Sequence, residues 1–547
     1  MKKKKIVALF LAALLCAGGI LTGCGNSGSA AGEAASEGQA ASEGNGEADG
    51  SGEAQSSANA TEYYGNDISE HLDMTMYVIG DEPVASDEVE AQINAILEEK
   101  ANVTLDISYI PLSDYTTKYQ LLLASGEEID IIYSSTWASY FEEARKGAYM
   151  EITEDMIAQY MPQTDQGQDK ASYESIKVNG SIYQIPKNSK YINNGVPVLI
   201  RGDLREKYGM DEITSYEDLE AYMTAVAENE EGIYAYAAAT DGVELSIQMF
   251  QRKNDLFGSN SLGKYIGYFY EGNNAPTAED MIWQYTTDEY REYVNLAKSW
   301  ADKGFWSKNA VSNTISPADA FINGTSATVF WNYDTCMTVY NTVMAEHPEW
   351  KPEMVDPNPE ATRYVGAYTE GMSVPASAPN PERSLMVIDL LKWDKELYDI
   401  ARYGIEGKNW IAKGDTNYQL GEEQANYTVG NSPITWGLKN DELERIQGEE
   451  GDTWPDIYVE LFSDPVNEAP SGFVFDDTSV KDELAVISEL CSQYIPILEL
   501  GLVDDPDATL DEFNEKCKQA GMDTILEEFR KQYTTYYEGL DLSLYTS

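Results

Sequence analysis

Hydrophobic residues in the first part of the chain alternate between the period of a strand and the period of a helix. Residues 72–79 alternate apolar and polar side chains, which predicts a half-buried strand. Val89, Ile93 and Leu97 then share one helical face, behind two acidic residues in the first turn. Continued along the chain, this reasoning predicts strands at 72–79, 103–109 and 129–133. It predicts helices between them, at 86–97 and 114–124. The order favours an α/β fold with a mostly parallel sheet covered by helices and ligands at the carboxyl ends of its strands.

The N-terminus has the composition of an export signal. Lys2 to Lys5 form a positive segment, and the apolar stretch 6–21 is short for a membrane span. It ends in Leu21-Thr22-Gly23-Cys24, which resembles the lipobox of bacterial lipoproteins, where the cysteine is acylated on sulfur and becomes the mature N-terminus. We therefore expect a signal peptide at 1–23, a lipid on Cys24 and attachment to the extracellular face of the cell membrane. The alternative is an ordinary secretory signal with an incidental Cys24.

A tether is expected at 24–61. Residues 25–60 consist almost entirely of Gly, Ala, Ser, Glu, Gln and Asn, and no aliphatic side chain is larger than alanine. Such a segment lacks the apolar surface that could offset its ordering entropy, so we expect it to be flexible. Gly-rich coil scaling gives it a reach on the order of 30 to 35 Å. About 485 of the 547 residues remain after it, which suggests two or more domains.

The chain is strongly acidic and poor in cysteine. It has 37 Lys and Arg against 94 Asp and Glu, a formal net charge of −57. Such a surface repels phosphate backbones, so nucleic acid is a poor candidate for a partner. Beyond the lipobox the chain holds Cys336, Cys491 and Cys517, an odd number at wide spacing, which does not support a disulfide framework. Apolar cores must therefore stabilise the fold.

Several segments match a known family in their order along the chain. The strand at 129–133 leads into a hydroxyl-rich loop with Trp137, and a helix then ends in Arg145-Lys-Gly before Tyr149-Met-Glu-Ile. Further matching segments lie at 181–186, 198–209 and 320–331. Together they resemble family 1 extracellular solute-binding proteins of bacterial ABC importers. Three later segments resemble the lipoprotein subgroup with a dedicated C-terminal domain, namely 403–410, 472–476 and 513–522.

The resemblance implies a periplasmic-binding-protein-like fold of two lobes, each a mostly parallel sheet flanked by helices, joined by crossover segments that act as hinges. It also implies a solute held between the lobes, a membrane permease of an ABC importer as partner, a monomer, and no cofactor, metal or catalysis. The expected crossovers lie near 186–197, 315–321 and 371–375. The N-terminal lobe is then expected at 62–190 plus 320–372. The C-terminal lobe is expected at 191–319 plus 373–547, with a helical segment from about 470 to 547.

A mono- or oligosaccharide is the solute that the sequence favours. A pyranose offers apolar C–H faces and a rim of hydroxyls, so its site needs aromatic platforms beside carboxylates, amides and hydroxyls. Residues of these types at predicted strand ends, near crossovers or at positions suggested by the family are Trp137, Tyr140, Tyr191, Asn194, Tyr236, Asp241, Trp331, Asp334, Glu370, Trp410 and Trp436. The alternative for each aromatic residue is core packing, and for Asp241 and Glu370 it is a solvated surface carboxylate.

The sequence leaves two other functions open. A membrane-anchored glycoside hydrolase would need a carboxylate pair, but no strand-end acid pair or eightfold βα repeat stands out. A receptor for peptides or another non-sugar solute would need a cation for the α-carboxylate, and Arg201 and Arg363 are the nearest candidates to the expected crossovers. His71 and His347 are the only histidines, so His-centred triads and His-rich zinc sites are not expected.

Overall fold

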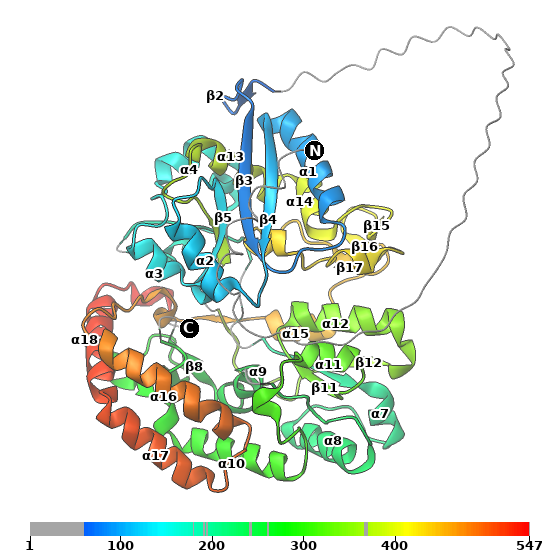
Figure 1. Cartoon of the computed structure of the whole chain (residues 1–547), viewed down its shortest axis with the longest axis vertical. Helices are drawn as coiled ribbons and strands as arrows, with labels where there is room; N and C mark the ends of the chain where they lie inside the picture. Colours follow the sequence, from blue (N-terminus) through cyan, green and yellow to red (C-terminus); the bar gives the residue numbers. More distant parts are fainter. Residues whose placement is uncertain are drawn as a thin grey trace, which may run out of the picture. The chain divides into compact units, whose positions relative to one another are not determined.

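The first lobe is built around a five-stranded sheet in the order β4-β3-β5-β14-β6 (Figure 1). The computed structural model describes residues 60–178, 180–189, 192, 195–239, 243–259, 262–365 and 370–545. The strands of this sheet are β3 (Leu72–Ile79), β4 (Val103–Ile110), β5 (Ile131–Ser135), β6 (Ile185–Pro186) and β14 (Glu370–Ser373). Strands β4, β3 and β5 run parallel, while β14 is antiparallel to both β5 and β6. With α1 (Ser86–Ala101) and α2 (Tyr115–Ala124) between the strands, the predicted βαβαβ order is confirmed.

Helix α1 forms for the reasons that its sequence pattern suggests. Val89, Ile93 and Leu97 are buried on one face, and two acidic residues occupy the first turn, where the helix dipole favours negative charge. The helix ends at Asn102, whose left-handed conformation (φ 52°) stops further helical turns. Along strand β3, Met74, Met76 and Val78 are buried and alternate with less buried residues, as expected for a strand whose two faces differ in burial.

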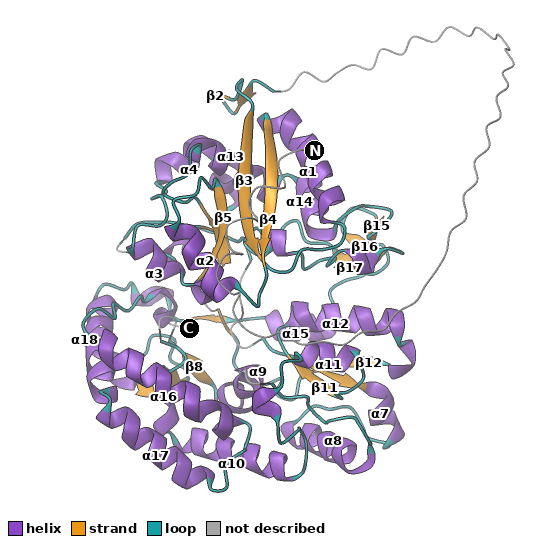
Figure 2. Ribbon diagram, in the orientation of Figure 1, coloured by secondary structure: helices purple, strands orange, loops and turns teal. Residues whose placement is uncertain are grey.

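Helices cover the sheet of the first lobe on both sides, as Figure 2 shows. They include α3 (Tyr140–Arg145), α4 (Glu154–Tyr160), α5 (Pro162–Gly167), α6 (Ala171–Glu174), α13 (Pro381–Trp393) and α14 (Lys395–Tyr403). A short hairpin, β1 (Glu62–Tyr63) with β2 (Asn66–Asp67), precedes the sheet. Beside α14 lies a small sheet of β15 (Trp410–Lys413), β16 (Asn417–Leu420) and β17 (Ile446–Gln447), which shares an aromatic cluster with that helix.

The second lobe contains two small antiparallel sheets. One has the order β11-β7-β12, with β7 (Val198–Arg201) paired to β11 (Thr328–Phe330) and β12 (Pro352–Val355). The other has the order β10-β9-β8, formed by β8 (Leu256–Gly258), β9 (Ile266–Phe269) and β10 (Ile282–Trp283). The two-lobed fold is confirmed, but the mostly parallel sheet expected in this lobe is wrong, because β7 lies between two antiparallel neighbours. Among the described strands of this lobe, only the two-residue strands β13 (Tyr364–Val365) and β18 (Val466–Asn467) pair in parallel.

Helices surround these strands. They include α7 (Gly202–Lys207), α8 (Tyr216–Asn229), α9 (Val243–Ser246), α10 (Asp288–Asp302), α11 (Pro317–Ile322), α12 (Tyr333–Glu346) and α15 (Asp456–Phe462). The C-terminal helices α16 (Lys481–Glu499), α17 (Pro506–Gln519) and α18 (Met522–Glu538) lie at the edge of the same lobe (Figure 1). Phe513 and Phe529 from these helices join the main core of the lobe, and Nε1 of Trp306 donates to the carbonyl of Leu500 at 2.8 Å. The helices from 481 to 538 are therefore part of the second lobe.

The boundaries between the lobes differ from those expected. Residues 57–547 form one compact unit, within which the chain passes between lobes after Pro186, after Val365 and after Gln447. The segment 320–365 belongs to the second lobe because β11 and β12 pair with β7. The segment 373–438 belongs to the first lobe because α13 and α14 fill its core. The crossover expected near 315–321 is wrong, since α11 lies within the second lobe, and β14 shows that the next crossover precedes 371.

The expected signal peptide, lipidated Cys24 and most of the tether lie outside the described residues. Among the helices of the described part of the chain, none has the length and apolar character that crossing a membrane would require.

Candidate ligand-binding cleft

An aromatic platform lies at the carboxyl end of β5 in the first lobe. Trp137 follows the strand in a single helical turn that ends at Ser139, a residue in the left-handed conformation (φ 64°). Its side chain is 40% exposed, although Tyr115 and Tyr133 pack against the indole at centroid distances of 5.1 and 5.8 Å. Trp436 joins the group, 6.4 Å from Tyr133. The platform therefore presents part of a large ring whose orientation is fixed by neighbouring rings.

A carboxylate is held beside this platform. The register of β14 on β5 places Glu370 opposite Ser135, at the end of the strand that leads to Trp137. Oε1 of Glu370 accepts hydrogen bonds from the Tyr133 hydroxyl at 3.0 Å and from Nε1 of Trp137 at 3.4 Å, and Oε2 pairs with Nζ of Lys187 at 2.5 Å. Burial, together with the charge of Glu370, raises the pKa of Tyr133 well above its ordinary value, so its hydroxyl remains a donor.

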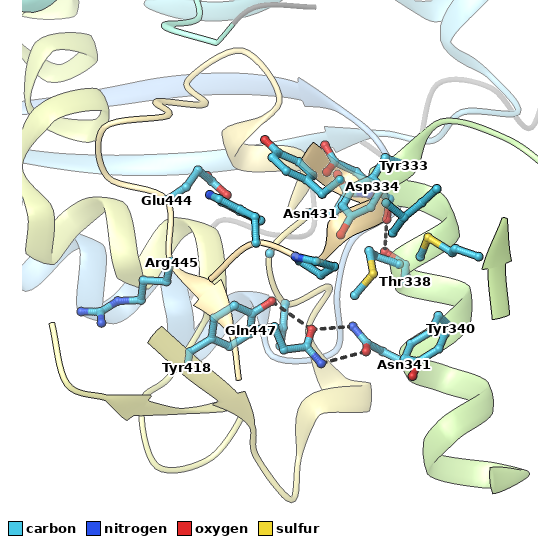
Figure 3. A pocket seen from close by; sticks show the side chains of 18 of the residues that line it. Tyr333, Asp334, Thr338, Tyr340, Asn341, Tyr418, Asn431, Glu444, Arg445 and Gln447 are labelled. Atoms are coloured by element: carbon cyan, nitrogen blue, oxygen red, sulfur yellow. Dashed lines mark hydrogen bonds between the residues drawn. The ribbon is translucent and has the colours of Figure 1, made fainter. Parts of the chain in front are cut away.

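A cavity of about 530 Å³ is lined by α12, β12 and residues 454–458 of the second lobe and by residues from the segment 402–447 of the first lobe. Its volume falls within the roughly 300 to 1,000 Å³ typical of small-molecule sites. Figure 3 shows Tyr333, Asp334, Thr338 and Asn341 on α12, with Tyr418 and Gln447 facing them from the opposite wall. Because residues of both lobes line the cavity, a solute in it would contact both lobes.

Two ion pairs have both partners in the lining of the cavity. Nζ of Lys439 lies 3.1 Å from Oδ2 of Asp334, across the boundary between the lobes. Burial raises the pKa of Asp334, but Lys439 and Arg402 act more strongly in the opposite direction and hold it below its ordinary value. The buried guanidinium of Arg402 pairs with Glu444 at 2.9 Å, and Tyr398 also donates to that carboxylate. The charges of the lining are thus largely neutralised within the protein.

Aromatic side chains line another part of the cavity. Trp454 and Tyr458 stack with a centroid distance of 4.2 Å, and Tyr333 of α12 meets Tyr458 edge-on at 4.9 Å. Tyr458 lies in α15, which begins directly after Pro455. Aromatic faces beside amides, hydroxyls and carboxylates are the combination that a pyranose requires.

An amide pair bridges the lobes at the side of the cavity. Asn341 Nδ2 donates to Oε1 of Gln447 at 3.0 Å, and Gln447 Nε2 donates to Oδ1 of Asn341 at 2.9 Å. The Tyr418 hydroxyl also donates to Gln447, at 3.3 Å. Figure 3 shows these three side chains joined in one row of hydrogen bonds.

The platform and the cavity are linked through adjacent backbone segments. The backbone N–H of Asn188 donates to the carbonyl of Lys439 at 2.8 Å, and that of Asp441 donates to the carbonyl of Asn188 at 3.0 Å. Lys187, which holds Glu370 at the platform, also contributes to lowering the pKa of Asp334 in the cavity. The two regions therefore lie close enough to share one electrostatic environment.

The structure brings some of the predicted site residues together. Trp137, Glu370 and Trp436 meet at the platform through Tyr133, and Asp334 lines the cavity. Trp331 instead packs on a small core cluster of the second lobe and is absent from the cavity lining. Tyr191, Asn194 and Asp241 lie outside the described residues.

Three residues that were predicted to contact the ligand are instead buried inside the protein, so these predictions are wrong. Tyr140 is enclosed in the core of the first lobe and donates to the carbonyl of Ile176 at 2.8 Å. Tyr236 lies in the core of the second lobe against Trp306 and Phe330. Trp410 is 3% exposed, and its N–H donates to the carbonyl of Gly404. Each ring is covered by protein, so core packing, the alternative given above, describes all three.

Sequence reasoning missed several residues that line the cavity, chiefly Arg402, Tyr418, Lys439, Glu444, Trp454 and Tyr458. One signal was available, because Trp454, Tyr458 and Phe462 recur every four residues on either side of Pro455, which marks an aromatic helical face. The charged residues gave no comparable signal, since they lie in a chain with many acids and in segments without a regular hydrophobic period.

Comparison with known proteins identifies the family. Residues 85–393 match the family described as bacterial extracellular solute-binding protein. The chain belongs to this family. Residues 470–538 match a domain of unknown function, DUF3502. The resemblance seen in the sequence, including the separate character of its C-terminal segment, is therefore confirmed.

Individual relatives agree with this assignment. The chain is 27% identical over 482 residues to a carbohydrate ABC transporter substrate-binding protein of Streptococcus pneumoniae, covering 84% of this chain and 90% of the relative. It is 23% identical over 345 residues to lipoprotein LipO of Bacillus subtilis, covering 58% of this chain and 63% of LipO.

A solved structure shows the same fold. The N-glycan transport solute-binding protein NgtS of S. pneumoniae, in complex with Man1GlcNAc, matches with a TM-score of 0.69 and 22% identity over 85% of this chain and 100% of NgtS. NgtS in complex with Man5GlcNAc matches with a TM-score of 0.63 at 23% identity, covering 86% of this chain and 99% of NgtS.

Proposed function

We propose that this solute-binding protein captures an uncharged oligosaccharide outside the cell and delivers it to the permease of an ABC importer. The observation that carries the proposal is the partly exposed ring of Trp137 beside the fixed carboxylate of Glu370. A ring face can cover the C–H face of a pyranose while a neighbouring carboxylate accepts from its hydroxyls. The carbohydrate transport named for the S. pneumoniae relative and the glycan complexes of NgtS support this choice of solute.

The state of the carboxylates supports binding rather than hydrolysis. A glycoside hydrolase needs one carboxyl group that stays protonated near neutral pH, which requires a raised pKa. In the cavity, Asp334 pairs with Lys439, its pKa is lowered, and Glu444 pairs with Arg402. The lowered pKa keeps Asp334 ionised, which suits hydrogen bonding to sugar hydroxyls.

The arginines considered for a peptide receptor have other partners. Arg201 pairs with Asp203 at 2.7 Å, and its guanidinium lies over the Trp350 ring. Arg363 is buried and pairs with Asp356, which also binds Arg252. Since both cations are engaged within the second lobe, a sugar remains the better candidate than a peptide with a free carboxylate.

The proposed mechanism uses the two lobes. A saccharide that contacts the platform and both walls of the cavity would favour the arrangement in which the lobes are close together, and this form would bind the permease. We further propose that a lipid on Cys24 anchors a monomer to the membrane. The lipobox-like Leu21-Thr22-Gly23-Cys24 and the likeness to lipoprotein LipO support the anchor. Cys24→Ala should release the exported protein into the medium, whereas retention on the membrane would contradict the anchor.

A thermal-shift screen of residues 62–547 tests the function. The panel contains Man1GlcNAc, Man5GlcNAc, other neutral oligosaccharides, amino acids, peptides and nucleosides. A ligand at 100 times its dissociation constant adds about 2.7 kcal/mol to the stability of the folded state. We expect a shift with a neutral saccharide that is recovered unchanged. A shift with peptides alone would reject the sugar, and turnover of the saccharide would favour the hydrolase.

A further inference from the structure

A second chamber opens beside the main cavity of the cleft. It has a volume of about 270 Å³ and is lined by the loop after β3, by α12 and by the segment 420–429. Thr338, Asn341 and Val429 line both spaces, so the chamber and the cavity share a wall. The chamber therefore lies where a ligand that extends beyond the main cavity would arrive.

The shared wall contains the amide pair that bridges the lobes. Asn341 lines both spaces, while Gln447 lines the main cavity and exchanges two hydrogen bonds with it, at 3.0 and 2.9 Å. These amide groups provide the same donors and acceptors that sugar hydroxyls use. A saccharide chain can therefore pass this point by replacing contacts of one amide with contacts to its own hydroxyls.

The lining of the chamber selects against negative charge. Its described side chains include the carboxylates of Glu82 and Glu346 and the polar groups of Thr342, Gln424, Asn426 and Thr428, with no Lys, Arg or His among them. An anionic group would be repelled by both carboxylates without a cation to balance it. Hydroxyl groups, in contrast, can donate to the carboxylates and amide oxygens and accept from the threonines.

The ends of the chamber are fixed by contacts of their own. Oε1 of Glu82 accepts from the Ser86 hydroxyl at 2.9 Å, and the backbone N–H of Ala85 donates to the carbonyl of Asn426 at 2.9 Å. The bond of Ala85 joins the loop after β3 to the segment 420–429, and the bond of Ser86 holds Glu82 at the start of α1. The chamber is therefore a formed space rather than a gap between independent loops.

We propose that this second chamber is a subsite for the distal residues of an extended, uncharged oligosaccharide, past the Asn341–Gln447 pair. The inference rests on the proposed function and adds to it a length and a charge preference. Short saccharides occupy the main part of the cleft alone, and longer ones also contact the chamber.

The test fills the chamber without changing the main cavity. Thr342 lies on α12 and lines the chamber but not the cavity, so Thr342→Trp should occupy the proposed subsite. Met344 lies on the same helix, is 41% exposed and lines neither space, which makes Met344→Trp the matched control. Isothermal titration calorimetry measures both variants and the wild-type protein with Man1GlcNAc as the short probe and Man5GlcNAc as the long one.

We expect Thr342→Trp to weaken binding of Man5GlcNAc about 10-fold or more, while binding of Man1GlcNAc changes less than about 2-fold. Met344→Trp should change neither. Retained binding of the short probe also shows that Thr342→Trp is folded. Equal weakening of both probes, or weakening of neither, would overturn the subsite. If the wild-type protein binds neither saccharide, the proposed function fails with these glycans, a result distinct from failure of the subsite.

The charge preference has its own readout. Man5GlcNAc with a phosphate on a terminal mannose should bind the wild-type protein about 10-fold more weakly than the unmodified glycan. Equal affinity for the two would contradict the selection against negative charge.

Discussion

Asn341 of the second lobe and Gln447 beside the first lobe exchange both of their amide hydrogen bonds, at 3.0 and 2.9 Å. The two residues are 106 positions apart in the sequence, and their contact joins α12 to β17. Together with the ion pair of Asp334 and Lys439, it holds the walls of the cavity together.

Removing this amide pair should favour separated lobes. Each hydrogen bond contributes about 0.5 to 1.5 kcal/mol, so Asn341→Ala should shift the balance between joined and separated lobes by about 1 to 3 kcal/mol. Small-angle X-ray scattering without ligand should then report a larger radius of gyration than for the wild-type protein. Asn229→Ala, at an exposed position near the end of α8, is the control. An unchanged radius of gyration in Asn341→Ala would mean that the pair does not contribute to closure.

Removing the charge of Glu370 should destabilise the first lobe. Lys187 is nearly buried, with a side chain 7% exposed, and Glu370 is its anionic partner at 2.5 Å. Loss of one partner of a fully buried pair costs about 3 to 5 kcal/mol. Because Glu370 retains some exposure, we expect Glu370→Gln to lower the free energy of unfolding by about 1 to 3 kcal/mol in urea denaturation.

A double variant separates charge from shape at the same site. Lys187→Met combined with Glu370→Gln should recover part of the lost stability, since no buried cation then faces the neutral amide. Glu449→Gln, which removes an exposed carboxylate, should have little effect. A double variant whose loss equals the sum of the two single losses would show that the pair is not coupled.

Glu468 should make the second lobe less stable as the pH rises. The side chain is buried and accepts from the Tyr268 hydroxyl at 2.9 Å, and burial raises its pKa to about 8 from 4.5. Between these values the folded state keeps the proton that the unfolded state has released, so stability falls as the pH increases from about 4.5 to about 8. Glu468→Gln keeps the hydrogen bond without the titration and should be more stable than the wild-type protein at pH 8, by on the order of a few kcal/mol.

Thermal unfolding at pH 5 and pH 8 checks this effect. From pH 5 to pH 8, the melting temperature of the wild-type protein should fall by more than that of Glu468→Gln. Glu515→Gln, at an exposed position of α17, should behave like the wild-type protein. If Glu468→Gln showed the same pH dependence as the wild-type protein, Glu468 would not be the group responsible.

The local pattern of the sequence was sufficient to predict the first strands and helices, because periods of two and 3.6 are set by neighbouring residues. The lobe boundaries were not predictable in this way. Thr328 pairs with Ile200, a partner 128 positions earlier, and no local pattern distinguishes this pairing from one in the other lobe.

The same limit applied to the site. Trp137 was found because it follows the end of a strand, where α/β sheets present ligand-binding residues. Glu370 was found because it was expected just before a crossover between the lobes. Tyr140, only three residues beyond Trp137, lies on the covered face of its helix, and that orientation depends on tertiary packing against Ile176 and its neighbours. Lys439 reaches Asp334 from a loop 105 positions away, so their ion pair could not be inferred from spacing.

The central claim is that Trp137 forms the sugar platform of the cleft, and isothermal titration calorimetry of Trp137→Ala with Man1GlcNAc tests it most directly. Loss of a buried stacking face should weaken binding by about 1 to 3 kcal/mol. Tyr64→Ala is the matched control, because Tyr64 is also an exposed aromatic residue but lies in the turn between β1 and β2. The account predicts weaker binding in Trp137→Ala and unchanged binding in Tyr64→Ala. Wild-type affinity in a folded Trp137→Ala variant would contradict the assignment of the platform.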